Sequence, residues 1–475
     1  MTQFFFVRPF SAILRSQAWA TLREAIRGSH QDYTEGPIGR AVVLLAIPMV
    51  LEMVLESVFA VVDVFWVSKL GADAVATVGM TESILALIYA VAIGLSMGAA
   101  ATVARRIGEK DPERAAAAAV QSIALGIAVA VPIGILGALS ARRLLALLGA
   151  PASVVATGVH FTQIMLGANV VILLLFLINA IFRGAGDATM AMRSLWLANI
   201  LNLVLDPCLI FGLGPFPRLG VTGAAVATTC GRGLGVLFQV WTLRRGRGRV
   251  VISRRHLHLE PRVMLRLLRV SANGIVQVMI GTASWIGLVR ILAMFGSAAL
   301  AGYTIGIRII VFAILPSWGL SNAAATMVGQ SLGAKNPDRA ERSVWIAALY
   351  DMFFLGGVGT LFLVFAGPLV RCFTNDPSIV AYGTGCLRIV SYGFPFYAYG
   401  MVTTQAFNGA GDTWTPTWIN LFCFWIWEIP LAYFLAQKLG LGPPGVFSAI
   451  AIAFSTLAVV SSLIFRQGKW KQKRV

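Results

Sequence analysis

Three carboxylic acids lie within an apolar stretch near the beginning of the chain. Glu52, Glu56 and Asp63 occur in residues 41–68, which hold no other charged side chain. In a helix that turns about 100° per residue, Glu56 and Asp63 lie about 40° and 20° from Glu52, so all three share one face. A carboxylate at the centre of a bilayer costs about 2.5–3.5 kcal/mol on an insertion scale, and such residues usually mark ion or substrate pathways. We therefore expect this face to line a cavity or a polar interface.

A second polar face occurs in residues 194–217. Asn199, Asn202 and Asp206 fall within an arc of about 60°, and Pro207 follows without a backbone N–H. We expect this face to meet the first one, so that Asn199, Asn202 and Asp206 form a candidate cation-coupling site together with Glu56 and Asp63. Close carboxylates can share a proton, whereas carboxylate and amide oxygens can bind Na⁺. The pattern does not decide between H⁺ and Na⁺.

The composition supplies the elements that must hold these residues. The 475 residues are 58% hydrophobic and 12% charged, with a mean hydropathy of +0.80, whereas soluble domains carry about 25% charged residues. About 20 apolar residues cross a bilayer as a helix, and the chain offers twelve such runs. The runs are continuous rather than alternating, which excludes a β-barrel. We predict an all-α integral membrane protein.

The chain also repeats itself at a spacing of 225 residues. The motif GEKDPERA at 108–115 returns as GAKNPDRA at 333–340, and FRGAGD at 182–187 returns as FNGAGD at 407–412. We therefore predict two pseudo-symmetric lobes of six transmembrane helices each. The KDP, KNP and GAGD segments are predicted to be turns, with Asp187 and Asp412 capping the helices that follow.

The two repeats differ in their acids. The positions equivalent to Glu52, Glu56, Asp63, Asn202 and Asp206 hold the following residues: Gln277, Gly281, Leu288, Trp427 and Leu431. The carboxylate chemistry is therefore expected in the first lobe. A purely structural alternative is that these acids pair with Arg232, Arg290 or Arg308 to lock the helices together.

The second repeat has isolated charges of its own. Glu428, next to Trp427, could form an aromatic pocket for a lipophilic cation, or it could pair with Arg388. We expect a substrate cavity that includes Glu52, Glu428, Trp427 and Arg388.

Basic residues set the expected topology and the domain boundaries. Most of the 38 Lys and Arg residues fall in segments that would lie inside if the N-terminus is inside, so both termini are expected in the cytoplasm. We expect a basic amphipathic tail at 1–36, an N-lobe at 37–245, a basic linker at 246–262, a C-lobe at 263–467 and a basic tail at 468–475. The first segment would lie on the inner leaflet, with a transit peptide as the alternative. The basic segments lack the interleaved aromatic residues of a nucleic-acid module, so no nucleic-acid partner is predicted.

The motifs as a set resemble the multidrug and toxic compound extrusion (MATE) transporters. The resemblance runs from Gly39 to about Phe465 and is carried by three segments: VDVFWVSKLGADAVATVG at 62–79, FRGAGDATMAMR at 182–193 and NLVLDPCLIFGLG at 202–214. It implies two six-helix lobes that open alternately to each side, with Asp63, Asn202 and Asp206 where members with an N-lobe site carry their coupling residues. It also implies Asn179 as a polar member of that cavity. Residues 270–289 and 377–411 lack the acids of many sodium-driven members, so the chain looks closer to the DNA-damage-inducible (DinF) and archaeal-type branch.

These observations give one leading expectation and one alternative. The leading one is a multidrug efflux antiporter of the bacterial inner membrane, a monomer of twelve spans, that exports amphipathic and often cationic compounds in exchange for H⁺ or Na⁺. Pro48 and Pro207 would act as hinges of the alternating access. The alternative is a flippase for lipid-linked oligosaccharide or another lipid, which would need a cationic cavity from Arg232, Arg290, Arg308 and Arg388. Neither an enzyme nor a cofactor is expected, because no nucleophile–base pair or metal cluster occurs.

Overall fold

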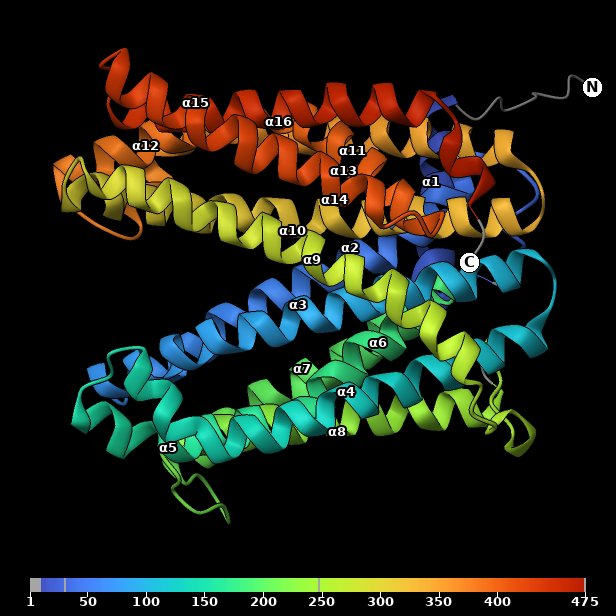
Figure 1. The fold of residues 1–475 in the computed structure, drawn as a ribbon, viewed down its shortest axis with the longest axis horizontal. Helices are drawn as coiled ribbons and strands as arrows, with labels where there is room; N and C mark the ends of the chain where they lie inside the picture. The colour runs from blue at the N-terminus through green and yellow to red at the C-terminus, as the bar shows by residue number, and fades with distance from the viewer. Residues whose placement is uncertain (1–9, 30, 247, 474–475) are drawn as a thin grey trace, which may run out of the picture.

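The computed structural model describes residues 10–29, 31–246 and 248–473 and is built of helices (Figure 1). The first lobe contains α2 (Ile38–Ser68), α3 (Ala72–Gly108), α4 (Pro112–Leu147), α5 (Ala152–Gly167), α6 (Asn169–Ala185), α7 (Ala188–Phe211) and α8 (Val221–Arg245). The second lobe contains α9 (Pro261–Ala293), α10 (Ser297–Gly333), α11 (Pro337–Arg371), α12 (Pro377–Ser391), α13 (Phe394–Gly409), the continuous stretch α14 (Trp414–Asn420), η2 (Leu421–Glu428), α15 (Ile429–Tyr433) and η3 (Phe434–Lys438), and α16 (Pro443–Arg466). Outside the lobes lie α1 (Phe10–Arg27) and the short helices η1 (Arg254–His256) and η4 (Lys469–Gln472).

These helices account for the predicted spans. Ten helical segments of the described chain are long and apolar enough to cross a membrane, and the pair α5 and α6, bent by 41°, forms an eleventh. The pair α12 and α13 occupies the equivalent place in the second repeat and completes six spans per lobe. The predicted all-α fold in two lobes is confirmed.

The repeated sequence motifs form equivalent local structures. Asp111 and Asn336 accept hydrogen bonds from the backbone N–H groups of Arg114 at 2.9 Å and Arg339 at 3.0 Å, and a proline follows each cap as the first helical residue. The GAGD turns behave less alike. Asp187 precedes α7 without capping it, because its carboxylate instead accepts a 2.5 Å hydrogen bond from the backbone N–H of Arg249.

The lobes touch through a symmetric crossing of α3 and α10. A Cβ added to Gly108 would overlap the carbonyl oxygen of Gln330, and one added to Gly333 would overlap that of Arg105. Both members of each contact are related by the 225-residue spacing, so the crossing lies on the pseudo-twofold axis. Only glycine allows the two backbones to come this close.

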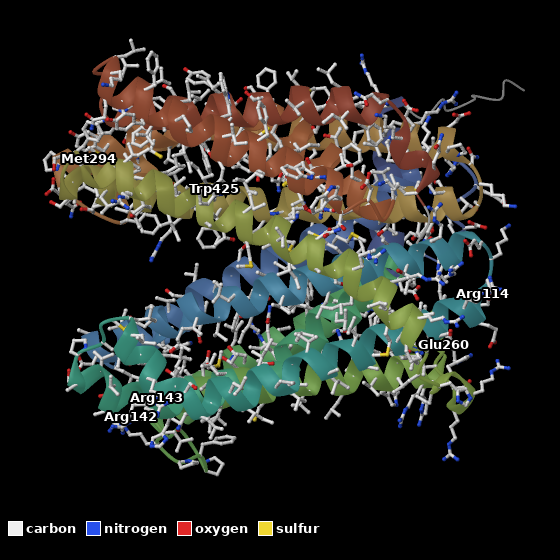
Figure 2. All side chains as sticks on the ribbon, viewed as in Figure 1. Arg114, Arg142, Arg143, Glu260, Met294 and Trp425 are labelled. Carbon is white, nitrogen blue, oxygen red and sulfur yellow. The ribbon has the colours of Figure 1, made fainter. Side chains whose placement is uncertain are left out.

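The two lobes separate from this crossing toward one end of the molecule (Figure 1). Arg142 and Arg143 at the end of α4 and Met294 at the end of α9 lie at that wide end, on opposite lobes, whereas Arg114 and Glu260 lie at the narrow end (Figure 2). The helix α1 and the C-terminal η4 also lie at the narrow end. The two lobes are therefore farther apart at the end away from the terminal segments (Figure 1).

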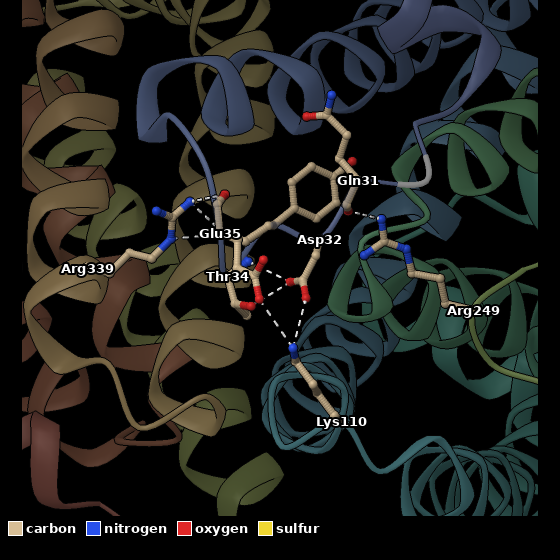
Figure 3. Close-up of polar contacts among 8 residues, drawn as sticks. Gln31, Asp32, Thr34, Glu35, Lys110, Arg249 and Arg339 are labelled. Carbon is tan, nitrogen blue, oxygen red and sulfur yellow. Dashed lines mark hydrogen bonds and ion pairs between the residues drawn. The ribbon is translucent and has the colours of Figure 1, made fainter.

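A short segment after α1, residues 31–36, bridges both lobes at the narrow end (Figure 3); we call it the crossing segment. From the C-lobe, Arg339 donates to the carbonyl oxygens of Tyr33 at 2.9 Å, Glu35 at 2.8 Å and Gly36 at 2.8 Å. From the N-lobe, Lys110 lies 3.3 Å from the Glu35 carboxylate, and Arg249 donates to the carbonyl oxygen of Gln31. The expected amphipathic tail is thus helical at 10–27, while residues 1–9 lie outside the described residues and its place on a leaflet stays a prediction.

Candidate functional site

The two polar faces of the first lobe meet where α2 packs against α7. The carboxyl groups of Asp63 and Asp206 lie within hydrogen-bonding distance of each other. Asp206 is fully buried and Asp63 partly buried. The carboxamide of Asn202, with its nitrogen turned toward Asp206, donates to that carboxyl at 2.8 Å, and its oxygen accepts from the Thr228 hydroxyl at 3.0 Å. Two carboxyl groups and an amide therefore converge in one buried place.

A second contact between the same helices lies one step along the face. Glu56 accepts a 2.9 Å hydrogen bond from Asn199 and lies 3.7 Å from the guanidinium of Arg232. Arg232 is 4% exposed and also donates to the Tyr89 hydroxyl at 2.9 Å. Because Arg232 is buried and is also held by Tyr89, it is a fixed counter-ion for Glu56.

Glu52 is likewise paired. Its Oε1 accepts from Arg183 at 2.7 Å and from Asn179 at 3.2 Å, and the Asn179 oxygen accepts from Gln239 at 2.7 Å. Glu52 is 1% exposed, and its Oε2 has no hydrogen-bond partner among the described residues. This network joins α2, α6 and α8 within the first lobe.

Two cavities lie near the contact between the lobes. The smaller one, about 100 Å³, is lined from the N-lobe by Met53, Met97 and Arg183 and from the C-lobe by Trp318, Asn322 and Asn408. The larger one, about 400 Å³, lies mainly within the C-lobe and is lined by aromatic residues and one acid, Glu428. Its aromatic lining consists of Trp285, Tyr303, Trp318, Tyr397, Phe424 and Phe454.

The comparisons with known proteins agree with this architecture. The model of the family described as MatE matches residues 48–208 and 275–434, which is more than half of the chain. The chain belongs to the MatE family. Its members are transporters, not enzymes, so this chain is a multi-pass membrane transporter.

Individual relatives extend the match over nearly the whole chain. The probable multidrug resistance protein NorM of Thermotoga maritima is 27% identical over 447 residues, which cover 92% of this chain and 94% of the relative. The FAD transporter of Shewanella oneidensis is 26% identical over 409 residues, which cover 83% of this chain and 88% of the relative. A solved structure, described as the outward-facing conformation of a multidrug resistance MATE family transporter of the MOP superfamily, superposes with a TM-score of 0.86 at 27% identity. It covers 95% of this chain and 98% of that chain.

Within this MatE transporter, the alternative that Arg232, Arg290 or Arg308 pairs with the acids holds for one acid, and a second acid pairs with an arginine that the alternative did not name. Glu52 and Glu56 pair with Arg183 and Arg232, respectively. Asp63 and Asp206 contact each other instead, and the charge of Arg232 acts on Asp63. The structure thus separates two acids that pair with arginines from two acids that contact each other.

The expected substrate cavity needs correction. Trp427 is 40% exposed, and Arg388 is exposed on the surface, where its Nε donates to the Leu363 carbonyl oxygen at 3.2 Å. Neither residue lines either cavity, and Arg388 does not pair with Glu428. Glu52 pairs with Arg183, and the arginine rather than the glutamate lines the smaller cavity. Of this set, Glu428 lines the larger cavity, and its role in substrate binding stays a prediction.

Three residues of the N-lobe site escaped the sequence analysis. Arg183 belongs to a repeated motif and looked like a loop charge, although only its own repeat has arginine there, since position 408 is asparagine. Thr228 carries no charge to single it out. Glu82 of α3, whose charge acts on Asp63, begins an apolar run and looked like its boundary. The difference between repeats at 183 and 408 was the one signal that could have revealed Arg183.

The two predicted hinges lie within helices. Pro48 is buried in α2, which runs unbroken from Ile38 to Ser68, and Pro207 lies in the last turns of α7. Each proline removes one backbone donor from its helix. Their action as hinges stays a prediction.

Proposed function

We propose that this transporter is a secondary active antiporter that exports amphipathic, often cationic compounds in exchange for protons by alternating access. The observation that carries the proposal is the contact between the Asp63 and Asp206 carboxyl groups. Two ionised carboxylates repel strongly in a medium of low dielectric, so such a contact requires a shared proton. Loss of that proton would drive α2 away from α7.

The orientation in the membrane is inferred from the charge distribution. The narrow end carries the basic segments, and the positive-inside rule places it in the cytoplasm with both termini. The wide end then faces outward, and the contact between Asp63 and Asp206 corresponds to the protonated form of the pair. Each proton that returns inward supplies about 2.3 kcal/mol per 100 mV of membrane potential.

The cargo class is inferred from relatives and from the cavities. The Thermotoga protein is described as a probable multidrug resistance protein, and both cavities are largely apolar with a few polar groups, as drug sites are. The Shewanella relative is described as an FAD transporter, so the same scaffold also serves another compound. A lipid flippase is less well supported, because none of Arg232, Arg290, Arg308 and Arg388 lines either cavity. Arg183 does line the smaller cavity, but its charge is paired with Glu52.

The test is efflux of a fluorescent organic cation from proteoliposomes under separate H⁺ and Na⁺ gradients. We expect a proton gradient to drive efflux, and Asp63→Asn and Asp206→Asn each to lower the initial rate by about tenfold or more, since the proton site is lost. Asp338→Asn, on the exposed first turn of α11, is the control and should transport normally. Efflux driven by Na⁺ alone would replace the proton by sodium at the Asp63, Asn202 and Asp206 oxygens. Normal transport by both site variants would refute the proposed role of the pair.

A further inference from the structure

The C-lobe contains two buried acids that the N-lobe mechanism does not use. Asp351 on α11 is fully buried, and Glu428 in the eleventh span is 3% exposed. Among the described residues neither forms an ion pair, in contrast to Glu52 and Glu56 in the N-lobe. A buried carboxylate without a counter-ion is strongly disfavoured, so both groups are neutral acids in this conformation.

The geometry around Asp351 supports a bound proton there. The Ser317 hydroxyl oxygen lies 2.6 Å from both carboxyl oxygens of Asp351. A hydroxyl has one hydrogen to donate, so a second short contact is favourable only if the acid donates as well. Ser317 follows Pro316 within α10, so the acid fastens α11 to α10 beside a proline. This acid is fully buried and lines neither of the two cavities.

Glu428 differs because it lines the 400 Å³ cavity. The titratable groups that act on it are the phenols of Tyr303 on α10 and Tyr397 on α13 and the thiol of Cys423 on its own helix, and all three are uncharged near neutral pH. Arg290 on α9 and Arg308 on α10 follow soon after the lining residues Leu288 and Ile307, but both arginines are exposed. The carboxyl group therefore faces an aromatic cavity that supplies no positive charge.

The backbone that carries Glu428 is also irregular. Residues Leu421–Glu428 form a π-helical stretch, and Pro430 follows two residues later without a backbone donor. π-Helical turns are rare and are frequently found at functional sites. The equivalent part of α7 in the N-lobe is a regular helix, so this irregularity belongs to the C-lobe alone.

We propose that Glu428 is a second exchange site, at which a monovalent organic cation replaces a proton. On binding, the Glu428 O–H bond breaks, the proton leaves to water, and the carboxylate that remains pairs with the cation, so one positive charge enters as one leaves. Aromatic faces of Trp285, Tyr303 and Phe424 add cation–π contacts in the desolvated cavity. Cargo and proton therefore compete at the C-lobe, apart from the Asp63 and Asp206 pair.

The inference shares with the proposed function only the organic cation as cargo, and binding alone tests it. Purified full-length protein in lightly buffered detergent is titrated with tetraphenylphosphonium, and released protons are followed with a pH-indicator dye. We expect about one proton per bound cation, and an affinity that rises with pH, because the proton competes. An affinity that does not change with pH would overturn the proposal without any variant.

Variants then locate the proton. Glu428→Gln should abolish proton release and weaken binding by about tenfold, since the charge pair is lost, whereas Glu428→Asp should retain release. The double variant Asp63→Asn, Asp206→Asn should still release the proton, even if it no longer transports. Release that survives Glu428→Gln, or that disappears in the N-lobe double variant, would overturn the assignment. The failure of this site and the failure of the coupling pair are therefore told apart.

Discussion

At the scale of single residues, five acids of the spans fall into three kinds, and Asp351, which Ser317 holds, is a fourth. Glu52 and Glu56 have arginine partners, Asp63 and Asp206 have each other, and Glu428 faces a cavity without a partner. The first kind holds helices together, and the other two need a proton or a cation to be stable. Charge pairing and access to a cavity, rather than the presence of an acid, thus separate structural from transporting groups.

The pair of Glu52 and Arg183 offers a direct test of this division. Arg183→Met leaves a fully buried carboxylate without its counter-ion, which should lower the free energy of unfolding by about 3–5 kcal/mol. Adding Glu52→Gln should recover most of that loss, because no charge remains unpaired. Thermal unfolding in detergent measures both variants. Losses that simply add in the double variant would show that the two residues act independently.

The sequence predicted the facing of the acids but not their partners. Helical spacing alone placed Glu52, Glu56 and Asp63 on one face, because that property is local. Which arginine reaches which acid depends on how α6 and α8 cross α2, and the sequence does not contain that angle. Arg388 shows the converse error, since an isolated charge in a span turned out to reach the surface.

At the scale of elements, the repeat determines how the lobes touch. Gly108 and Gly333 occupy equivalent positions, and each faces a carbonyl oxygen of the opposite lobe. The repeat was visible in the sequence, and so was the order of twelve spans. The 41° bend between α5 and α6 and the π-helical stretch before Glu428 were not, because both result from packing rather than from local propensity.

We expect Gly333→Ala and Gly108→Ala to weaken this crossing. The added methyl group overlaps a backbone oxygen that cannot rotate away, and overpacking of this kind costs about 1–3 kcal/mol. Gly357→Ala is the matched control, because its added Cβ meets no atom within 4 Å. Thermal midpoints should fall for the first two variants and stay level or rise for the control. Equal midpoints for all three would show that the crossing is not tightly packed.

At the scale of the whole molecule, the segments near both termini join the two lobes at the narrow end. The crossing segment is held by Arg339 of the C-lobe and by Lys110 and Arg249 of the N-lobe (Figure 3). The C-terminal segment adds a 2.5 Å hydrogen bond from Arg105 of the N-lobe to the carbonyl oxygen of Lys473. The sequence predicted basic segments here as topology signals, but not that they bind the backbone across the two lobes.

If alternating access opens the narrow end, these contacts must break on at least one lobe. Arg339→Ala removes four hydrogen bonds to the crossing segment and should shift the population toward the narrow-end-open state. A cysteine is placed at Asn408, which lines the smaller cavity. The readout is its labelling by an impermeant thiol reagent added from the side of the terminal segments. Labelling should be about fivefold faster or more, since net loss of two such bonds is worth at least 1 kcal/mol. Arg342→Ala, one turn along the same helix and exposed, should label at the parental rate. Equal rates for both variants would mean that the crossing segment follows the motion of the lobes without restraining it.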